Sequence, residues 1–384
     1  MTNTAECFSP WLPRKRQVTA FAAVAGLVVV SLALRNPLMA GQESDDPPVA
    51  NQKQADSPVP AKQQAKSPPA LVEDRVVFTL KGHTDFVMSV AFSPDGKRLA
   101  SCGFMEDGTI KVWDATTGRE LLTLKGHACP EFVVFSPDGK RLASAGADYK
   151  VKLWDTTNGR ELLTLKGRIC APLTFSPDGR RLAATGVDSN KTVEVMWWDA
   201  ASGDELLTMK GHTRPECDFY GVVFSPDFKR LATTCVSRDN ISAVKMADAT
   251  TGQELFTLSL TRGVAPSSQG GVAAFSPDGT RMLGIDGNQA VKVWAVPSGR
   301  ELLTLPGRTR QVTSVAVSPD GKRLAAGRND SSVRLCDAMS GHELLRLTGH
   351  TREVSSVVFS PNGMRLASGS DDHTVIVWDI TPRP

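Results

Sequence analysis

A four-residue turn signal that recurs along the chain constrains its fold more than any other feature. Ser-Pro-Asp-Gly begins at Ser93, Ser136, Ser176, Ser276 and Ser318, and close variants begin at Ser225 and Ser360. Successive copies lie 43, 40, 49, 51, 42 and 42 residues apart. Proline presets φ for a type I turn, and glycine takes the left-handed position that ends it. Because alternating apolar runs flank the turns, each copy predicts a β-hairpin, and the period predicts one four-stranded unit per repeat.

A second signal recurs between the turns. Gly-His begins at Gly82, Gly126, Gly211 and Gly349, and Trp-Asp begins at Trp113, Trp154, Trp198 and Trp378. With these motifs the chain resembles the WD40-repeat family over residues 73–384. The resemblance implies an all-β, seven-bladed β-propeller with four antiparallel strands per blade. It also implies that residues 75–80 supply the fourth strand of the last blade, which closes the ring and leaves no long unpaired edge.

The resemblance further implies a hydrogen-bonded tetrad of His, Ser or Thr, Asp and Trp within a blade. Complete sets are His83, Ser101, Asp107 and Trp113 in blade 1, His127, Ser144, Asp148 and Trp154 in blade 2, and His350, Ser368, Asp372 and Trp378 in blade 7. Buried polar groups of this kind need such partners. Ser, His and Asp also form nucleophilic triads, but a set that recurs at the period of the fold indicates a scaffold. We therefore predict no catalytic residue, no metal site and no cofactor.

Blades 3 to 6 depart from this pattern. The departures are Arg168 and Ala184 in blade 3, the ending Met246-Ala247-Asp248 without Trp in blade 4, Asn288 at the Asp position of blade 5, and Arg308, Ala326 and Cys336 in blade 6, which keeps Asp330. Strand pairing and apolar packing must hold these blades with less help from polar networks. We therefore expect blades 4 and 5 to open first.

Partner binding is expected at one rim of the ring. Family geometry places the Gly-His loops and the loops between the second and third strands on the same rim, the top, and exposed loops on a rigid scaffold are where binding residues concentrate. Aromatic and arginine side chains there are typical interface anchors, and our candidates are Phe86, Arg214, Phe219, Tyr220, Arg310 and Arg352. The near balance of 44 Lys and Arg against 41 Asp and Glu argues against nucleic acid as the partner. The sequence thus favours a non-catalytic protein-interaction scaffold, and the alternative is an exported propeller that binds or processes a small ligand in its central channel.

The N-terminal region predicts a membrane tether. Residues 18–34 carry no charge and follow the basic triplet Arg14-Lys15-Arg16. A run of this length and flanking charge predicts a transmembrane signal anchor over residues 18–35, with residues 1–17 in the cytoplasm and the propeller outside it. The alternative is a cleaved signal peptide, which would make the protein secreted or periplasmic. Residues 36–72 are rich in Pro, Gln, Lys and Ala and predict a disordered linker.

Two further patterns leave alternatives open. Cys129, Cys170 and Cys217 occupy similar positions in successive repeats, so a disulfide or metal contact stands beside the simpler interpretation of buried thiols. Basic residues follow each turn on the opposite rim, the bottom, at Lys97-Arg98, Lys140-Arg141, Arg180-Arg181, Lys229-Arg230, Arg281, Lys322-Arg323 and Arg365. This ring of charge predicts either contact with anionic lipid or an acidic partner, or a rim neutralised by the glutamates that begin the fourth strands.

Overall fold

The computed structural model describes residues 71–73, 75–165, 169–187, 193–210, 217–237, 242–259, 271–285, 291–296, 298–305 and 312–382. The expected cytoplasmic segment, signal anchor and nearly all of the expected linker lie outside these residues. Within them, no helix is long and apolar enough to span a membrane.

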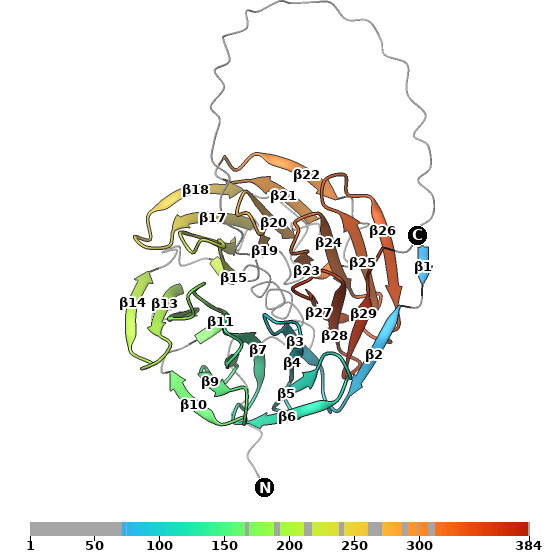
Figure 1. The fold of residues 1–384 in the computed structure, drawn as a ribbon. Coiled ribbons are helices and arrows are strands. Elements are labelled where there is room, and N and C mark those ends of the chain that lie inside the picture. Colours follow the sequence, from blue (N-terminus) through green and yellow to red (C-terminus); the bar gives the residue numbers. More distant parts are fainter. Residues whose placement is uncertain are drawn as a thin grey trace, which may run out of the picture.

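The described chain forms 29 strands in seven sheets, which stand around a closed ring (Figure 1). Consecutive strands run from the inside of the ring to the outside, and their pairing within each blade is antiparallel. The predicted seven-bladed propeller is confirmed. Each blade repeats the same register, because apolar alternation and the turn signal recur with the same spacing.

The strands are grouped by blade as follows. Blade 1 contains β3 (Val87–Phe92), β4 (Arg98–Gly103), β5 (Thr109–Asp114) and β6 (Glu120–Lys125), and blade 2 contains β7 (Pro130–Phe135), β8 (Arg141–Gly146), β9 (Val151–Asp155) and β10 (Glu161–Leu165). Blade 3 contains β11 (Ile169–Phe175), β12 (Arg181–Val187), β13 (Val193–Asp199) and β14 (Glu205–Lys210), and blade 4 contains β15 (Cys217–Phe224), β16 (Arg230–Ser237), β17 (Ser242–Asp248) and β18 (Glu254–Ser259).

The second half of the ring follows the same plan. Blade 5 contains β19 (Gly271–Phe275), β20 (Arg281–Ile285), β21 (Val291–Ala295) and β22 (Glu301–Leu305), and blade 6 contains β23 (Val312–Val317), β24 (Arg323–Arg328), β25 (Ser332–Asp337) and β26 (Glu343–Thr348). Blade 7 contains β27 (Val354–Phe359), β28 (Arg365–Ser370) and β29 (Thr374–Asp379), and its outermost strand is β2 (Val76–Lys81).

The two ends of the propeller meet in blade 7. β2 pairs antiparallel with β29, with Leu80 opposite Val375 and Lys81 opposite Thr374. The first strand segment of the repeat region therefore completes the last blade, as the sequence predicts. A further strand was not predicted: β1 (Leu71–Glu73) pairs in parallel with β26 at the outer edge of blade 6. Leu71 and Val72, which were expected to belong to the linker, thus belong to a strand.

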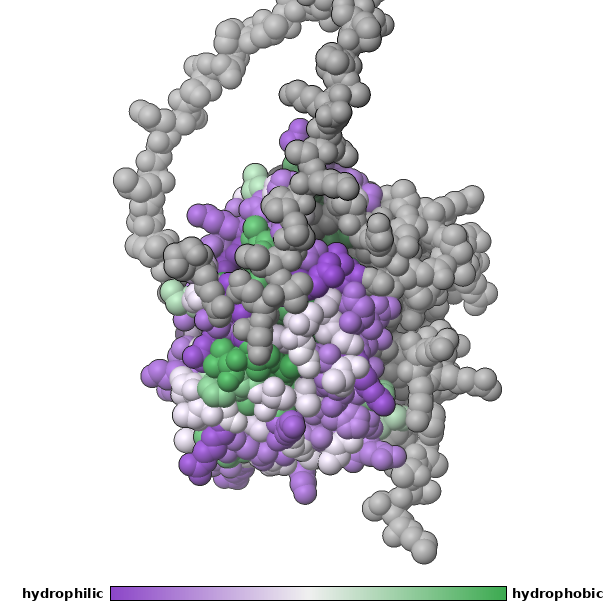
Figure 2. All heavy atoms as spheres, turned by 90° about the vertical axis from the view of Figure 1, so that its right-hand side faces the viewer, coloured by the Kyte–Doolittle hydropathy of each residue, from purple (hydrophilic) through white to green (hydrophobic). Residues whose placement is uncertain are grey.

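Burial decreases from the centre of the ring to its outside. Every residue of β3, β7 and β27 is buried, because these inner strands are enclosed by neighbouring blades. The outermost strands expose one of their leucines, such as Leu121 at 45% and Leu344 at 45%. Figure 2 looks at the rim on the side of β1, β26 and β2 and shows a mostly hydrophilic surface with an apolar patch within it.

The arginine that follows each bottom turn joins neighbouring blades. Arg98 donates from Nη2 to the carbonyl of Gly139 at 2.6 Å and from Nη1 to that of Thr156 at 3.1 Å, and its guanidinium lies 5.6 Å from the centroid of the Phe135 ring. Arg141, Arg323 and Arg365 make equivalent bonds to the backbone of the following blade. The described glutamates that begin the fourth strands of blades 1 and 2 pair with lysines of the third strands. Glu120, for example, pairs with Lys111 at 3.0 Å.

Candidate functional site

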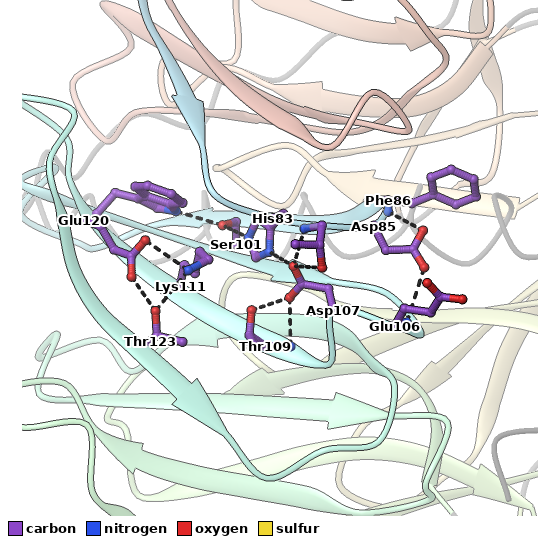
Figure 3. Close-up of polar contacts among 12 residues, drawn as sticks. His83, Asp85, Phe86, Ser101, Glu106, Asp107, Thr109, Lys111, Glu120 and Thr123 are labelled. Carbon is purple, nitrogen blue, oxygen red and sulfur yellow. Dashed lines mark hydrogen bonds and ion pairs between the residues drawn. The ribbon is translucent and has the colours of Figure 1, made fainter. Parts of the chain in front are cut away.

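The four residues of the predicted tetrad in blade 1 come from separate strands and loops and meet around Ser101 (Figure 3). His83 Nε2 lies 2.7 Å from Ser101 Oγ, and Trp113 Nε1 donates to the same oxygen at 2.8 Å. His83 Nδ1 lies 3.2 Å from Asp107 Oδ2 on the other side of the ring. Ser101 is fully buried and Trp113 is 2% exposed, so no substrate reaches this hydroxyl.

Blades 2 and 7 repeat this arrangement. His127 lies 2.8 Å from Ser144 Oγ and 3.0 Å from Asp148, while His350 lies 2.8 Å from Ser368 Oγ and 2.9 Å from Asp372. Trp154 and Trp378 donate to the serines of their blades at 2.7 and 2.8 Å. All twelve residues that the sequence assigns to the tetrads therefore meet in three groups of four.

The tetrad aspartates are held in their ionised form. Burial alone would raise the pKa of the Asp107 carboxyl, but hydrogen bonds from His83 and Thr109 outweigh it and hold that pKa well below its usual range. The same balance, with His350 and Thr374, lowers the pKa of Asp372. An ionised Asp fixes the proton on the facing His nitrogen, which leaves Nε2 as the acceptor for the serine hydroxyl. In blades 2 and 7 both ring nitrogens of the His are hydrogen-bonded. In blade 1, His83 Nδ1 is buried without a hydrogen bond and has only the 3.2 Å ion pair with Asp107.

A lysine extends the tetrads of blades 1 and 2 toward the outside of the ring and was missed in the sequence, whereas blade 7 has Ile376 at this position. Lys111 Nζ donates to Glu120 at 3.0 Å and to Thr123 Oγ1 at 3.1 Å, and it lies 5.9 Å from the Trp113 ring centroid. Lys152 makes the same contacts with Glu161, Thr164 and Trp154 in blade 2. The sequence pattern could have revealed these lysines. Each lies two residues before the Trp of its blade and therefore on the same face of the strand.

Blade 6 replaces the tetrad with an ion pair. Arg328, at the end of β24, is 3% exposed and donates from Nε to Asp330 Oδ2 at 3.0 Å. Asp330 thus keeps a cationic partner, although Ala326 and Cys336 supply neither the hydroxyl nor the indole. The sequence pointed to Arg308 as the replacement for His, but Arg308 and Arg168 lie outside the described residues. In blade 3, Trp198 is buried beside a strand in which Ala184 offers no hydroxyl.

Two of the partner-binding candidates lie together at the top of the seam between blades 7 and 1. Phe86 contacts the His373 ring edge-on at a centroid distance of 5.8 Å, and Arg352 is exposed on the loop before β27. Figure 3 shows Phe86 pointing away from the tetrad, beside Asp85. Arg214 and Arg310 lie outside the described residues. Phe219 and Tyr220 were expected in a loop, but both belong to β15, because its pairing with β16 continues as far as Cys217 opposite Ser237. Their side chains are not described.

The same seam contains two carboxyl groups that the sequence did not single out. Asp371 donates its backbone N–H to the carbonyl of Glu353 at 3.0 Å. Asp371 Oδ1 and Glu353 Oε1 are buried and have no hydrogen-bond partner. Burial, and then the neighbouring Glu353, raises the pKa of Asp371 to about 7. A buried oxygen without a hydrogen bond lowers the stability of the folded state. Two carboxyl oxygens at this seam are in that condition.

The cysteines and acidic residues give no metal centre within the described part of the chain. No group of three or more His, Cys, Asp or Glu side chains there has a geometry that could hold an ion. Cys102 and Cys129 are buried in the apolar core of blades 1 and 2. The side chains of Cys170 and Cys217 are not described, so a contact among Cys129, Cys170 and Cys217 stays a prediction.

Comparison with known proteins places the repeats in a family. The family model described as WD domain, G-beta repeat matches residues 74–114, 118–155, 299–337 and 341–379. These four matches fall on blades 1, 2, 6 and 7, which include all three blades with complete tetrads.

Three relatives carry similar repeats. They are small ribosomal subunit protein RACK1z of Arabidopsis thaliana, 44% identical over 50 residues (13% of this chain and 15% of that protein), WD repeat-containing protein 1-B of Xenopus laevis, 49% identical over 49 residues (13% and 8%), and WD repeat-containing protein VIP3 of Arabidopsis thaliana, 58% identical over 45 residues (12% and 13%). Each similarity spans a small part of the relative. The family matches show that the chain carries WD40 repeats in four of its blades, and the described ring of seven sheets is a seven-bladed β-propeller.

Proposed function

We propose that this protein is a non-catalytic interaction scaffold that binds protein partners through the top loops of its propeller. WD40 propellers typically serve as protein-interaction scaffolds, and the described Ser-His-Asp sets are enclosed by tryptophans. The complete tetrads lie in the blades on either side of the closure, and family geometry places the variable loops at one end of the ring. This division suits a protein that presents a binding surface.

The observation that carries the proposal is the composition of the top seam between blades 7 and 1. Phe86 and Arg352 are residues of the kind that anchor interfaces, and Arg352 is exposed. Beside them, Asp371 Oδ1 and Glu353 Oε1 lack hydrogen-bond partners. A partner that docks on this seam would contact an aromatic and a cationic anchor beside these two acidic residues.

Proximity labelling with the full chain tests this surface. One variant carries Phe86→Ala and Arg352→Glu, a second carries Arg214→Ala, Phe219→Ala and Tyr220→Ala, and a control carries Lys97→Glu on the exposed bottom rim. We expect one set of neighbours to be lost from the first variant, or from both top variants, and to be kept by the control. If all three variants label the same proteins as the unaltered chain, the top-face assignment is wrong.

We also propose that the N-terminal segment tethers the propeller to a membrane with the propeller outside the cytoplasm. The uncharged run over residues 18–34 and the preceding basic triplet support this orientation. Alkaline extraction of membranes should leave the full chain in the pellet and release a chain that lacks residues 1–35. Protease added from outside the cytoplasm should digest the linker. A full chain that alkali extracts completely, at its unprocessed mass, would contradict the anchor, whereas loss of the segment would identify a cleaved signal peptide.

A further inference from the structure

Blade 6 differs from its neighbours on one face of its sheet. In blade 1, β4 ends at Gly103, and a Cβ atom there would lie 2.4 Å from Asp107 Cγ and 2.6 Å from His83 Nδ1. Blade 6 has Arg328 at the equivalent end of β24. Cys336, opposite Leu324, takes the register of Trp113, which is opposite Leu99. Blade 6 thus has a thiol where blade 1 has the indole ring of Trp113. It also has an arginine side chain where blade 1 has a glycine with no room for a side chain.

Three arginines share this face. Arg334 in β25 is the cross-strand partner of both Ala326 in β24 and Arg346 in β26. Arg328 stands two residues after Ala326, so its side chain leaves the same face of β24. The equivalent residues of blade 1 are Lys111, Thr123 and Gly103. Blade 6 therefore has two more positive charges than blade 1 on the equivalent face of its sheet.

The described acidic residues do not balance these charges. Glu343 lies 3.1 Å from Arg334 Nη1 and 3.0 Å from Arg346 Nε. Asp330 lies 3.0 Å from Arg328 Nε. Three guanidinium groups thus face two carboxylates, and one positive charge is left over. In blade 1, by contrast, Lys111 faces the two carboxylates of Asp107 and Glu120.

One of the arginines also lacks a hydrogen-bond partner at a buried atom. Arg334 Nε is enclosed and has none. Burial lowers the pKa of Arg334, and the charges of Arg328 and Arg346 lower it further, against the opposing effect of Glu343. Like charges at this spacing repel, and a desolvated guanidinium N–H without an acceptor is costly. An anion with several acceptor oxygens, bound at the exposed guanidinium nitrogens, would offset this repulsion.

The cluster opens toward the outside of the ring. The side chain of Arg328 is 3% exposed, whereas those of Arg334 and Arg346 are 26% and 37% exposed. Arg346 also pairs with Val72 of β1, where the N-terminal segment reaches the propeller. A small ion can thus approach from the rim, where Figure 2 shows a mostly hydrophilic surface.

We propose that Arg328, Arg334 and Arg346 form a binding site for a small oxyanion of the phosphate class at the outer rim of blade 6. Planar guanidinium groups present paired N–H donors that match the oxygens of phosphate. The site is separate from the top seam and does not depend on the proposed scaffold function. The phosphate group can belong to a free ion or to a lipid headgroup, and both present the same oxygens to the arginines.

Calorimetric titration of the full chain with inorganic phosphate, at constant ionic strength set by chloride, tests the site. The cluster variant carries Arg334→Lys and Arg346→Thr, which are the residues of blades 1 and 2 at these positions and are therefore compatible with the fold. The control carries Arg119→Lys and Arg160→Thr, the same exchanges at two exposed bottom-rim arginines. We expect one phosphate per chain, an affinity lower by about tenfold or more in the cluster variant, and no change in the control.

Vesicles distinguish the two sources of phosphate. Phosphatidic acid in phosphatidylcholine is compared with phosphatidylcholine alone, using the same three proteins. Vesicle binding that only the cluster variant loses assigns the site to a headgroup, even when the free ion binds weakly. The proposal is overturned if neither phosphate nor phosphatidic acid binds, or if the cluster variant and the control bind them equally. Should the double variant misfold, the single exchange Arg346→Thr at the more exposed arginine gives the same comparison.

Discussion

Ser356 of blade 7 accepts a hydrogen bond from the backbone N–H of Val90 in blade 1, with 3.3 Å between nitrogen and Oγ. The same contact joins Ser314 to Val357 at 3.1 Å and Ser89 to Val133 at 3.4 Å. Inner strands have no partner strand on the channel side, so their free N–H groups need other acceptors. A serine at the third position of the inner strand provides one for the next blade. These serine contacts run from blade 6 through the closure to blade 2.

Removing one such contact should weaken the closure measurably. Ser356→Ala leaves the buried N–H of Val90 without this acceptor, and we expect the free energy of unfolding to fall by about 1 to 2 kcal/mol. Urea unfolding followed by tryptophan fluorescence measures the loss. Thr348→Ala, on the exposed outer strand of blade 6, serves as the control and should cost much less. Equal losses in the two variants would show that the serine contact carries no special weight.

The closing strand should matter more than any single side chain. A chain that begins at residue 82 lacks β2 and leaves β29 with an unpaired edge, so we expect a large loss of cooperativity and rapid cleavage by protease. A chain that begins at residue 71 keeps β1 and β2 and should resist protease as well as the full propeller. Both chains lack residues 1–70, so they differ only in residues 71–81, which contain β1 and β2, and a third chain that begins at residue 75 keeps β2 alone. Equal resistance of the chains that begin at residues 71 and 82 would contradict the assignment of β2 as the closing strand.

Phe228 takes the place of the turn glycine in blade 4. Its backbone conformation is strained, but its side chain gains packing contacts that glycine cannot make. Its φ of 60° is left-handed, as at Gly96 and Gly279, which costs a side chain about 1 kcal/mol. Its ring stacks on Phe224 at 4.7 Å and contacts Trp197 edge-on at 5.0 Å. We expect Phe228→Gly to lower stability by about 1 to 2 kcal/mol, because lost aromatic packing exceeds the relieved strain. Phe228→Ala keeps the strain and should cost more. A Gly variant more stable than the natural chain would reverse the argument.

Glu131 should make the stability of the propeller depend on pH. The residue is 6% exposed, and burial, followed by the charge of Asp148, raises the pKa of its carboxyl to about 8. The folded state therefore binds a proton that the unfolded state releases above about pH 4.5. Stability should fall as pH rises from there to about 8 and then level off. Glu131→Gln should remove this slope and raise the melting temperature above about pH 8. Glu131→Met, the residue of blade 1 at this position, is the control for loss of charge, and an unchanged slope in both would disprove the role of Glu131.

The regular features of this fold could be predicted because each depends on a short sequence motif that recurs along the chain. Ser93 accepts the N–H of Arg98 at 2.9 Å in the first turn, and the corresponding serines do the same in the others. The same motif therefore forms the same turn in all seven blades. The tetrads were predictable for the same reason, since their residues occupy fixed positions relative to the turns.

The features that were missed depend on contacts between blades or on replacements. The bond from Arg98 to Gly139 joins residues that a repeat alignment does not compare. Arg328 could not be assigned, because its role follows from the loss of the His and Trp partners elsewhere in blade 6. The carboxyl pair of Glu353 and Asp371 has no motif, since the loops bring the two together at only one seam. Side-chain chemistry that crosses a blade boundary is thus the part of the site least visible in sequence.

Blades 4 and 5 should open before the rest of the ring. The third inner-strand position holds Gly221 in blade 4 and Val272 in blade 5, so neither residue can form the serine contact. Blade 4 also has Ala247 where blade 1 has Trp113. Hydrogen exchange by mass spectrometry should show faster exchange in β16 and β17 than in β4 and β5, because fewer polar contacts resist local opening there. Thr233 takes the register of Ser101, but blade 4 has no Trp at the tetrad position, so Thr233→Ala serves as a control that leaves the rates unchanged. If peptides from blades 4 and 5 are the best protected, strand pairing and apolar packing outweigh the serine contacts and tetrads in setting the order of opening.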